Sequence, residues 1–189
     1  NSAATLVVNQ PDGVGDTIAE GGSFTVNYDL SDSDDVTTVS FFYETDGNGA
    51  GGTVIGGCGT QPEATGGTCV WDTTGVAPGS YFVYGTTSGD GAGAATVVSS
   101  GTMTINGAAT LVVNQPDGVG DTIAEGGTFT VNYDLSDSDD VTTVSFFYET
   151  DGNGVGGTAI AGCATQPEAT GGTCVWDTTG VAPGSYFVY

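Results

Sequence analysis

The feature that most constrains this chain is an internal duplication that runs through its whole length. The segment Ala3–Asp12 recurs as Ala108–Asp117, an offset of 105 residues (108 − 3), and the offset holds to the last residue. A period of this length matches a complete β-sandwich domain and is far longer than one solenoid repeat. We therefore predict two tandem domains, residues 1–106 and residues 107–189.

The two copies are nearly identical, because they differ at only six positions. Every exchange is small in size and polarity. The pairs are Ser2/Gly107, Ser23/Thr128, Ala50/Val155, Val54/Ala159, Gly56/Ala161 and Gly59/Ala164. Near-identical tandem copies are typical of rods, stalks and adhesins, in which added copies contribute length or valency.

Hydrophobic alternation with a period of two predicts strands in each copy. In the segment Ser23–Leu30, Phe24, Val26, Tyr28 and Leu30 fall on one face and polar residues on the other. Clusters of Gly, Pro, Asn and Asp separate runs of this kind, and no segment has a helical period. Each complete copy accommodates seven or eight short strands, the last over residues 94–106. The fold class is therefore predicted to be all-β, built from antiparallel β-sandwich domains.

The charge balance excludes several classes of function. The chain has no Lys, Arg or His and carries 23 acidic residues, giving a net charge of -23. Nucleic-acid binding requires basic side chains that release counterions, and anionic membrane surfaces recruit basic segments. No apolar run is long enough for membrane insertion. We predict no enzyme activity, since a carboxylate pair for glycoside hydrolysis is the main catalytic route left and near-duplicate domains with loop carboxylates do not favour it.

The cysteines predict one local disulfide in each copy. Cys58 and Cys69 lie eleven residues apart (69 − 58), and Cys163 and Cys174 repeat this spacing (174 − 163). A zinc site would need all four thiols from two domains, because the chain contains neither His nor a CxxC motif. Disulfides persist in oxidising compartments, so an extracellular or cell-surface location is expected.

Two segments carry a family resemblance. Gly79–Val83 is similar to strand F of immunoglobulin and fibronectin-type sandwiches, where a Tyr two residues before a core residue forms a tyrosine corner. Phe24–Asp46, with its acidic loop, is similar to the bacterial immunoglobulin-like repeats of large surface proteins. The resemblance covers essentially all of each copy. It implies two tandem immunoglobulin-like domains and says little about function.

Acidic residues gather in several predicted loops. Carboxylate and amide oxygens are ligands that Ca²⁺ prefers, although a full EF-hand pattern is absent. The favoured alternative is that these residues form turns and keep the protein soluble; no other cofactor is expected. If calcium binds, the expected ligands are Asp32, Asp34, Asp35 and Asp46.

The second copy stops at Tyr189, which corresponds to Tyr84, so the second domain is expected to lack its final strand. One hypothesis is truncation of a longer array. The other is strand donation, in which a strand of another copy fills the open edge. The expected donor strand consists of Thr5, Leu6, Val7, Val8 and Asn9.

These observations favour a structural subunit of an extracellular filament or surface stalk. Its partners are expected to be other copies of itself, joined head to tail into a homopolymer by β-strand addition. The alternative is an adhesin or carbohydrate-binding surface module that uses tandem copies for avidity. That alternative needs outward-facing aromatic side chains, for which Phe82 and Tyr84 are weak candidates that are expected to pack under a loop or against a neighbour instead.

Overall fold

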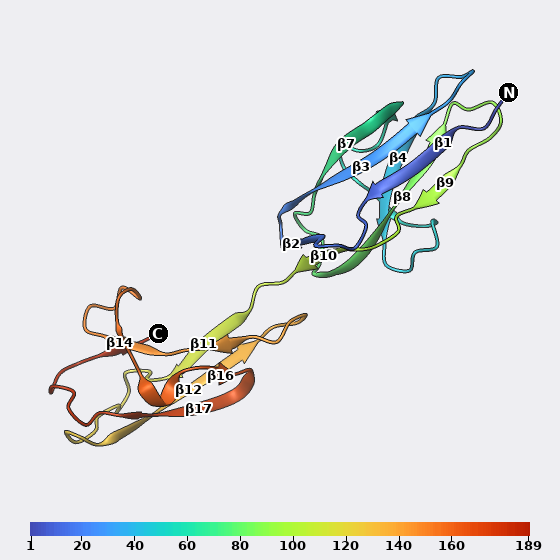
Figure 1. Ribbon diagram of the computed structural model, residues 1–189. Helices are drawn as coiled ribbons and strands as arrows, with labels where there is room; N and C mark the ends of the chain where they lie inside the picture. Colours follow the sequence, from blue (N-terminus) through green and yellow to red (C-terminus); the bar gives the residue numbers. More distant parts are fainter. The chain divides into compact units, whose positions relative to one another are not determined.

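The computed structural model describes residues 1–189 and divides them into two compact units, Asn1–Gly107 (unit 1) and Ala108–Tyr189 (unit 2). The boundary lies one residue beyond the predicted end of the first domain. Every regular element is a β-strand except one short 3-10 turn (Figure 1). The predicted all-β class is therefore confirmed. None of the helical structure is long and apolar enough to span a membrane.

The first sheet of unit 1 follows the alternation seen in the sequence. Its strands pair antiparallel in the order β1–β3–β7. On β3, Phe24, Val26, Tyr28 and Leu30 are all buried, while the residues between them are half-buried or exposed. The bounds are β1 (Thr5–Gln10), β3 (Ser23–Ser31) and β7 (Ala64–Asp72).

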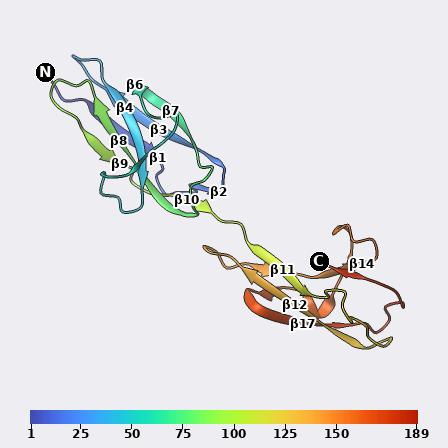
Figure 2. The ribbon, with the colours of Figure 1, turned by 180° about the vertical axis from the view of Figure 1, so that it is seen from behind.

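The second sheet of unit 1 has the order β2–β10–β8–β4–β5, with β6 paired to β4 and β9 to β8 (Figure 2). Strand β10 lies between β8, its antiparallel neighbour, and β2, its parallel neighbour. The two sheets face each other as an immunoglobulin-like sandwich. The bounds are β2 (Thr17–Ala19), β4 (Thr38–Glu44), β5 (Thr53–Val54), β6 (Gln61–Pro62), β8 (Gly79–Ser88), β9 (Thr96–Val98) and β10 (Met103–Asn106).

The prediction of one final strand over residues 94–106 was wrong, because this segment forms two strands. β9 pairs with the later part of β8 and β10 with its beginning. Between them, the Ser99 hydroxyl accepts a hydrogen bond from the Val83 N–H (3.1 Å) and donates one to the Gly101 carbonyl (2.7 Å). The Ser99 N–H still donates to the Val83 carbonyl (2.7 Å), so only the return bond of this pair passes through the side chain, where the chain shifts along β8.

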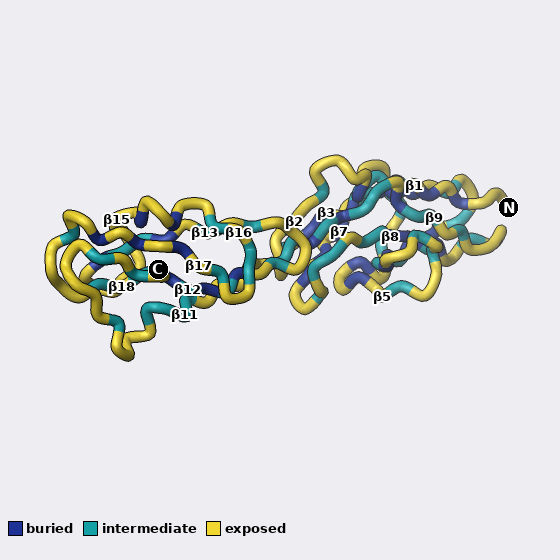
Figure 3. The backbone as a smooth tube through the Cα atoms, turned by 90° about the horizontal axis from the view of Figure 1, so that it is seen from below, coloured by how far each residue is buried: buried dark blue, intermediate teal, exposed yellow.

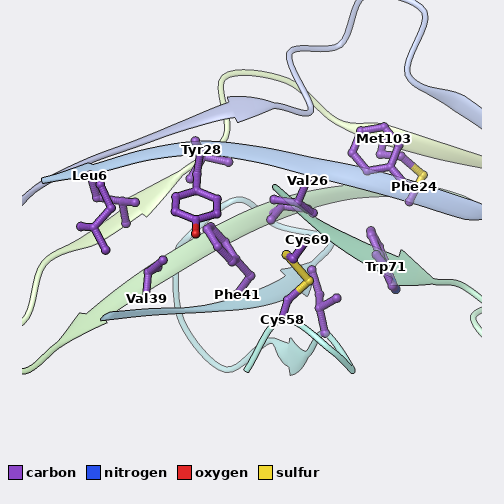
Figure 4. Packing of buried hydrophobic residues seen from close by; sticks show 14 of the residues in the cluster. Leu6, Phe24, Val26, Tyr28, Val39, Phe41, Cys58, Cys69, Trp71 and Met103 are labelled. Atoms are coloured by element: carbon purple, nitrogen blue, oxygen red, sulfur yellow. A yellow bond between two sulfur atoms is a disulfide. The ribbon is translucent and has the colours of Figure 1, made fainter. Parts of the chain in front are cut away.

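The core of unit 1 combines aliphatic side chains with aromatic rings and contains a disulfide (Figure 4). The rings of Tyr28 and Phe41 meet at 5.1 Å between centroids. The disulfide between Cys58 and Cys69, with Cα atoms 5.6 Å apart, ties the segment after β5 to β7. Both predicted disulfides are present, since Cys163 and Cys174 are joined in unit 2.

The tyrosine corner implied by the family resemblance is also present. The Tyr81 hydroxyl donates a hydrogen bond to the Ala77 carbonyl, 2.8 Å away and four residues upstream. Its ring packs edge-on against Tyr43 and Trp71, and Trp71 is buried. Tyr186 repeats the bond in unit 2, where it donates to Ala182 over 2.6 Å. The corner therefore fixes the loop that precedes the central strand of the second sheet.

One glycine of the sheet is required by a buried ring. Gly67 lies opposite Tyr28 across the β3–β7 ladder, and a Cβ at Gly67 would lie 2.8 Å from Cε1 of Tyr28 and closer still to Cζ. The ring cannot move away freely, because it is buried and its hydroxyl donates to the Pro62 carbonyl (2.9 Å). We therefore expect Gly67→Ala to lower the free energy of unfolding of unit 1 by about 2 kcal/mol in urea titrations.

The matched control for this prediction is Gly56→Ala. A Cβ at Gly56 meets no atom within 4 Å, and the second copy carries Ala161 at the corresponding position. This substitution should leave the unfolding midpoint unchanged or raise it slightly. Equal effects of the two substitutions would show that the Tyr28 contact does not govern the requirement for Gly67.

Unit 2 repeats the first sheet in full and the second sheet in part. The order β11–β12–β17 matches β1–β3–β7, while β13 pairs with β16, and β14 lies between β15 and β18. A single 3-10 turn, Ala161–Cys163, leads to the disulfide. The bounds are β11 (Thr110–Gln115), β12 (Thr128–Ser136), β13 (Thr143–Val144), β14 (Phe147–Glu149), β15 (Thr158–Ala159), β16 (Gln166–Pro167), β17 (Ala169–Asp177) and β18 (Phe187–Val188).

Some apolar side chains that are buried or half-buried in unit 1 are exposed to solvent in unit 2. Leu6 is 7% exposed but its counterpart Leu111 is 42% exposed, and Ile123 is exposed as well. The counterparts of β9 and β10 would follow residue 189 in this numbering. In unit 1, β10 contributes Met103 and Ile105, both fully buried. The yellow segments of Figure 3 mark where exposed residues lie along the chain of each unit.

The six differences between the copies lie at the surface of the fold, away from the buried core. Ser2, Ser23, Ala50, Val54, Gly56 and Gly59 are all exposed in unit 1. None contributes to the buried cluster of its unit. The two copies therefore differ only at positions where adding or removing a small group changes no contact in the core.

Candidate functional site

Three carboxylates converge at one end of unit 1. One oxygen each of Asp32, Asp35 and Asp90 lies within 4.8 Å of the other two, and all three residues are half-buried. Asp32 and Asp35 were predicted as ligands, whereas Asp90 was not. Its loop follows β8, and the β4–β8 pairing of Thr38 with Ser88 brings it to the loop before β4. The sequence carried no signal of this pairing.

Each of these carboxylates already accepts hydrogen bonds. Asp35 accepts one from the Gly91 N–H (2.9 Å). Asp90 accepts from the N–H groups of Ala4 (2.7 Å) and Ala92 (2.6 Å). Asp32 accepts from the Thr37 hydroxyl at 3.0 Å. The cluster therefore ties three segments together at this end of the unit, as turn-forming acids do.

Asp34 does not join this group, contrary to the prediction. Its carboxylate accepts hydrogen bonds from the Ser2 hydroxyl (2.7 Å) and the Ser2 N–H (3.1 Å) and lies 3.7 Å from the terminal amine of Asn1. The bond from the Ser2 hydroxyl holds the pKa of this carboxyl below its ordinary value. Asp34 is directed to the N-terminal segment because that segment runs beside the β3–β4 loop.

Asp46 was wrongly grouped with the other three, since it lies at the opposite end of β4. It follows the last residue of that strand, Glu44, whereas Asp32 and Asp35 precede the first. Asp46 accepts a hydrogen bond from the Asn48 amide (2.6 Å), and Glu44 accepts one from the Gly49 N–H (2.6 Å). The four predicted ligands therefore lie in three environments, and only Asp32 and Asp35 share one.

Other acidic side chains accept hydrogen bonds that link neighbouring strands. Asp29 accepts hydrogen bonds from the Asn9 amide (2.9 Å) and the Gly66 N–H (2.6 Å), and so links β1, β3 and β7. These bonds lower the pKa of the Asp29 carboxyl. Asp134 in unit 2 has the corresponding two bonds and the same direction of shift. This pattern is the turn and ladder chemistry favoured for most of the acidic residues.

The aromatic side chains considered for a glycan platform lie beneath a loop, as predicted. Tyr84 is 5% exposed, stacks on Phe42 at 5.0 Å between centroids, and its hydroxyl accepts a hydrogen bond from the Gly52 N–H (3.1 Å). A Cβ at Gly47 would lie 3.2 Å from the ring of Phe82. The glycine-rich loop between β4 and β5 therefore packs its backbone directly on these rings.

The expected donor strand is an integral part of unit 1. Thr5, Leu6, Val7, Val8 and Asn9 lie within β1, which pairs with β3. Leu6 and Val8 are buried in the core, and only Val7 among the apolar residues points outward. The strand is therefore not free, and its release would remove two side chains from the core.

No protein-family model matches the chain, and no curated protein matches it. Among solved structures, the fibronectin(III)-like modules of Clostridium thermocellum CbhA share 15% identity with it over 92% of this chain and 78% of theirs, with a TM-score of 0.38. A chimeric titin Z1Z2 tandem shares 15% identity over 91% of this chain and 85% of its own (TM-score 0.32).

The two tandem V-type regions of VCBP3, a v-region-containing chitin binding protein, share 12% identity over 94% of this chain and 88% of theirs, with a TM-score of 0.33. TM-scores of this size carry no inference about function. The assignment of an immunoglobulin-like sandwich rests on the strand order and the tyrosine corner of the chain itself.

Proposed function

We propose that this chain is a non-catalytic structural subunit of an extracellular filament or surface stalk. The observation that carries the proposal is the tandem of near-identical sandwich units whose six differences are all at exposed positions. Repetition of one stable domain adds length or valency without new chemistry. The disulfide in each unit supports an oxidising, extracytoplasmic setting.

Self-association by β-strand addition is the proposed activity, and the acceptor within residues 1–189 is the edge of β18 in unit 2. β18 pairs only with β14, whereas its counterpart β8 also pairs with β9 and β10. Leu111 and Ile123 are exposed in unit 2, whereas the counterpart of Leu111 in unit 1, Leu6, is buried in the core. Unpaired edges beside apolar surface recruit strands from other chains.

The proposed donor is β1 of another copy, whose Leu6 and Val8 alternate as Met103 and Ile105 do in β10. Because donor and acceptor belong to different units of one chain, repeated donation builds a head-to-tail homopolymer. Donation has a cost, since Leu6 and Val8 must first leave their own core. Assembly is therefore expected to be slow and to depend strongly on concentration.

The test is sedimentation of residues 1–189 over a concentration series, with negative-stain electron microscopy of the same samples. The matched control is Thr5→Cys/Ser31→Cys, because these exposed residues are directly opposite in the β1–β3 ladder and a disulfide between them would hold β1 in place. We expect fibres from the parent chain and monomers from the locked variant. Monomers from both would overturn strand addition, and fibres from both would exclude β1 as the donor.

A further inference from the structure

A loop in each unit places oxygen-bearing side chains at the spacing of a calcium loop. After β14, Glu149, Asp151 and Asn153 occupy the first, third and fifth positions and Gly154 the sixth. EF-hand loops use side chains at the same three positions, with Gly at the sixth. The twelfth position is the buried Ile160 in place of the usual Glu, so the sequence pattern alone does not establish a site.

An independent observation in unit 2 points to a missing partner. Glu149 is only 9% exposed, and its Oε1 accepts a hydrogen bond from the Gly154 N–H at 2.6 Å. Its other oxygen, Oε2, is buried and has no hydrogen-bond partner. The corresponding oxygen of Glu44 in unit 1 accepts a long hydrogen bond from the Ala50 N–H (3.4 Å), a bond that Oε2 of Glu149 lacks. A buried acceptor in such a position requires compensation.

The chain itself has no cation to supply. It contains no Lys, Arg or His, and the terminal amine of Asn1 is paired with Asp34 in unit 1. A buried carboxylate without a cation or a full set of donors is strongly disfavoured. A metal ion bound from outside the chain would supply the partner that Oε2 of Glu149 lacks.

The surroundings of Glu149 suit a hard metal ion. Glu149 and Asp151 both line an open hollow of about 360 Å³, together with Tyr148, Thr158 and Tyr186. Asp151 is exposed and uses one oxygen to accept a hydrogen bond from the Asn153 amide (2.7 Å). Two carboxylates beside solvent provide oxygen ligands of the kind that Ca²⁺ prefers, with room for its water ligands.

We propose that the loop after β14 binds Ca²⁺ through Glu149 and Asp151, and that Glu44 and Asp46 form the equivalent site in unit 1. Without an acidic twelfth residue, the sites are expected to be weak, with Kd values of about 10⁻⁴–10⁻³ M, in the range of extracellular modules. The proposal is independent of the structural role proposed above. It also separates these loops from the Asp32–Asp35–Asp90 cluster, whose carboxylates are tied to backbone and hydroxyl donors.

The experiment uses Tb³⁺ as a luminescent probe and Ca²⁺ as the competitor, with residues 1–189 at pH 7 and both disulfides intact. Tyr148 and Tyr186 line the same hollow as Glu149, so excitation of tyrosine should sensitise emission from a bound Tb³⁺. We expect Ca²⁺ to abolish this emission at millimolar concentrations, and Mg²⁺ to compete at least about tenfold less well because it is less tolerant of irregular geometry.

The decisive variants are Glu44→Gln/Glu149→Gln and, separately, Asp46→Asn/Asp151→Asn. Gln keeps an oxygen that can accept the glycine N–H, and the two aspartates are exposed, so the second pair tests the site even if the first fails to fold. Each pair should weaken Ca²⁺ competition by about tenfold or more, because the charge of the ligands sets affinity.

The control is Asp32→Asn/Asp35→Asn/Asp90→Asn, which removes more charge but leaves both loops intact. It should retain sensitised emission and Ca²⁺ competition. The proposal is overturned if this control loses binding while the loop variants keep it. It is also overturned if the folded parent chain shows no sensitised emission.

Discussion

Extending the chain beyond Tyr189 with a copy of the segment Gly85–Asn106 should raise the thermal transition of unit 2 by about 10 °C or more. In residues 1–189, calorimetry should show two transitions, with unit 2 unfolding first, because Leu111 and Ile123 are exposed there. The added segment would supply the counterparts of Met103 and Ile105, which are fully buried in unit 1. Burial of two such side chains contributes about 3–6 kcal/mol before the cost of ordering the new backbone.

The two transitions should then merge. After the extension the units would differ only at the six exposed positions, and exposed exchanges of small residues change stability little. The extended chain should also lose the capacity for strand addition, since its acceptor edge is closed. A matched extension with Ser in place of the counterparts of Met103 and Ile105 should raise the transition temperature of unit 2 much less than the full extension does. If the full extension left the transition temperature of unit 2 unchanged, the unpaired edge would not be the cause of its lower stability.

Removal of the Cys58–Cys69 disulfide is expected to lower the free energy of unfolding of unit 1 by about 3 kcal/mol. The crosslink spans eleven residues and closes a glycine-containing loop, so its loss would increase the conformational freedom of the unfolded chain. The variant is Cys58→Ala/Cys69→Ala in a Trp176→Phe background. Trp71 is then the only tryptophan, and its fluorescence reports the urea unfolding of unit 1 alone.

The second copy provides the control for this prediction. Cys163→Ala/Cys174→Ala in the same background removes an identical crosslink from unit 2 and should leave the Trp71 transition unchanged. A shift well below 1 kcal/mol on loss of Cys58 and Cys69 would mean that the surrounding sandwich, and not the crosslink, orders this loop.

Much of the architecture was determined by the sequence alone. The period-two alternation of Phe24, Val26, Tyr28 and Leu30 predicted β3 and its buried face, because strand side chains alternate between the two faces of a sheet. The spacing of the cysteines predicted both local disulfides. The resemblance of Gly79–Val83 to strand F of immunoglobulin-type sandwiches implied the tyrosine corner. Each of these features depends on short-range periodicity, spacing or a local contact, which a sequence displays directly.

The position of the acidic sites was decided only by the tertiary structure. Asp90 joins Asp32 and Asp35 through the pairing of β4 with β8, and no local pattern reports which strands become neighbours. Asp46 is separated from them because an extended strand carries the chain away from its starting end. Long-range pairing likewise divided residues 94–106 into two strands. The tertiary structure also decided which carboxylate lacks a partner, because Glu149 is 9% exposed and its Oε2 accepts no hydrogen bond, and no sequence pattern reports this.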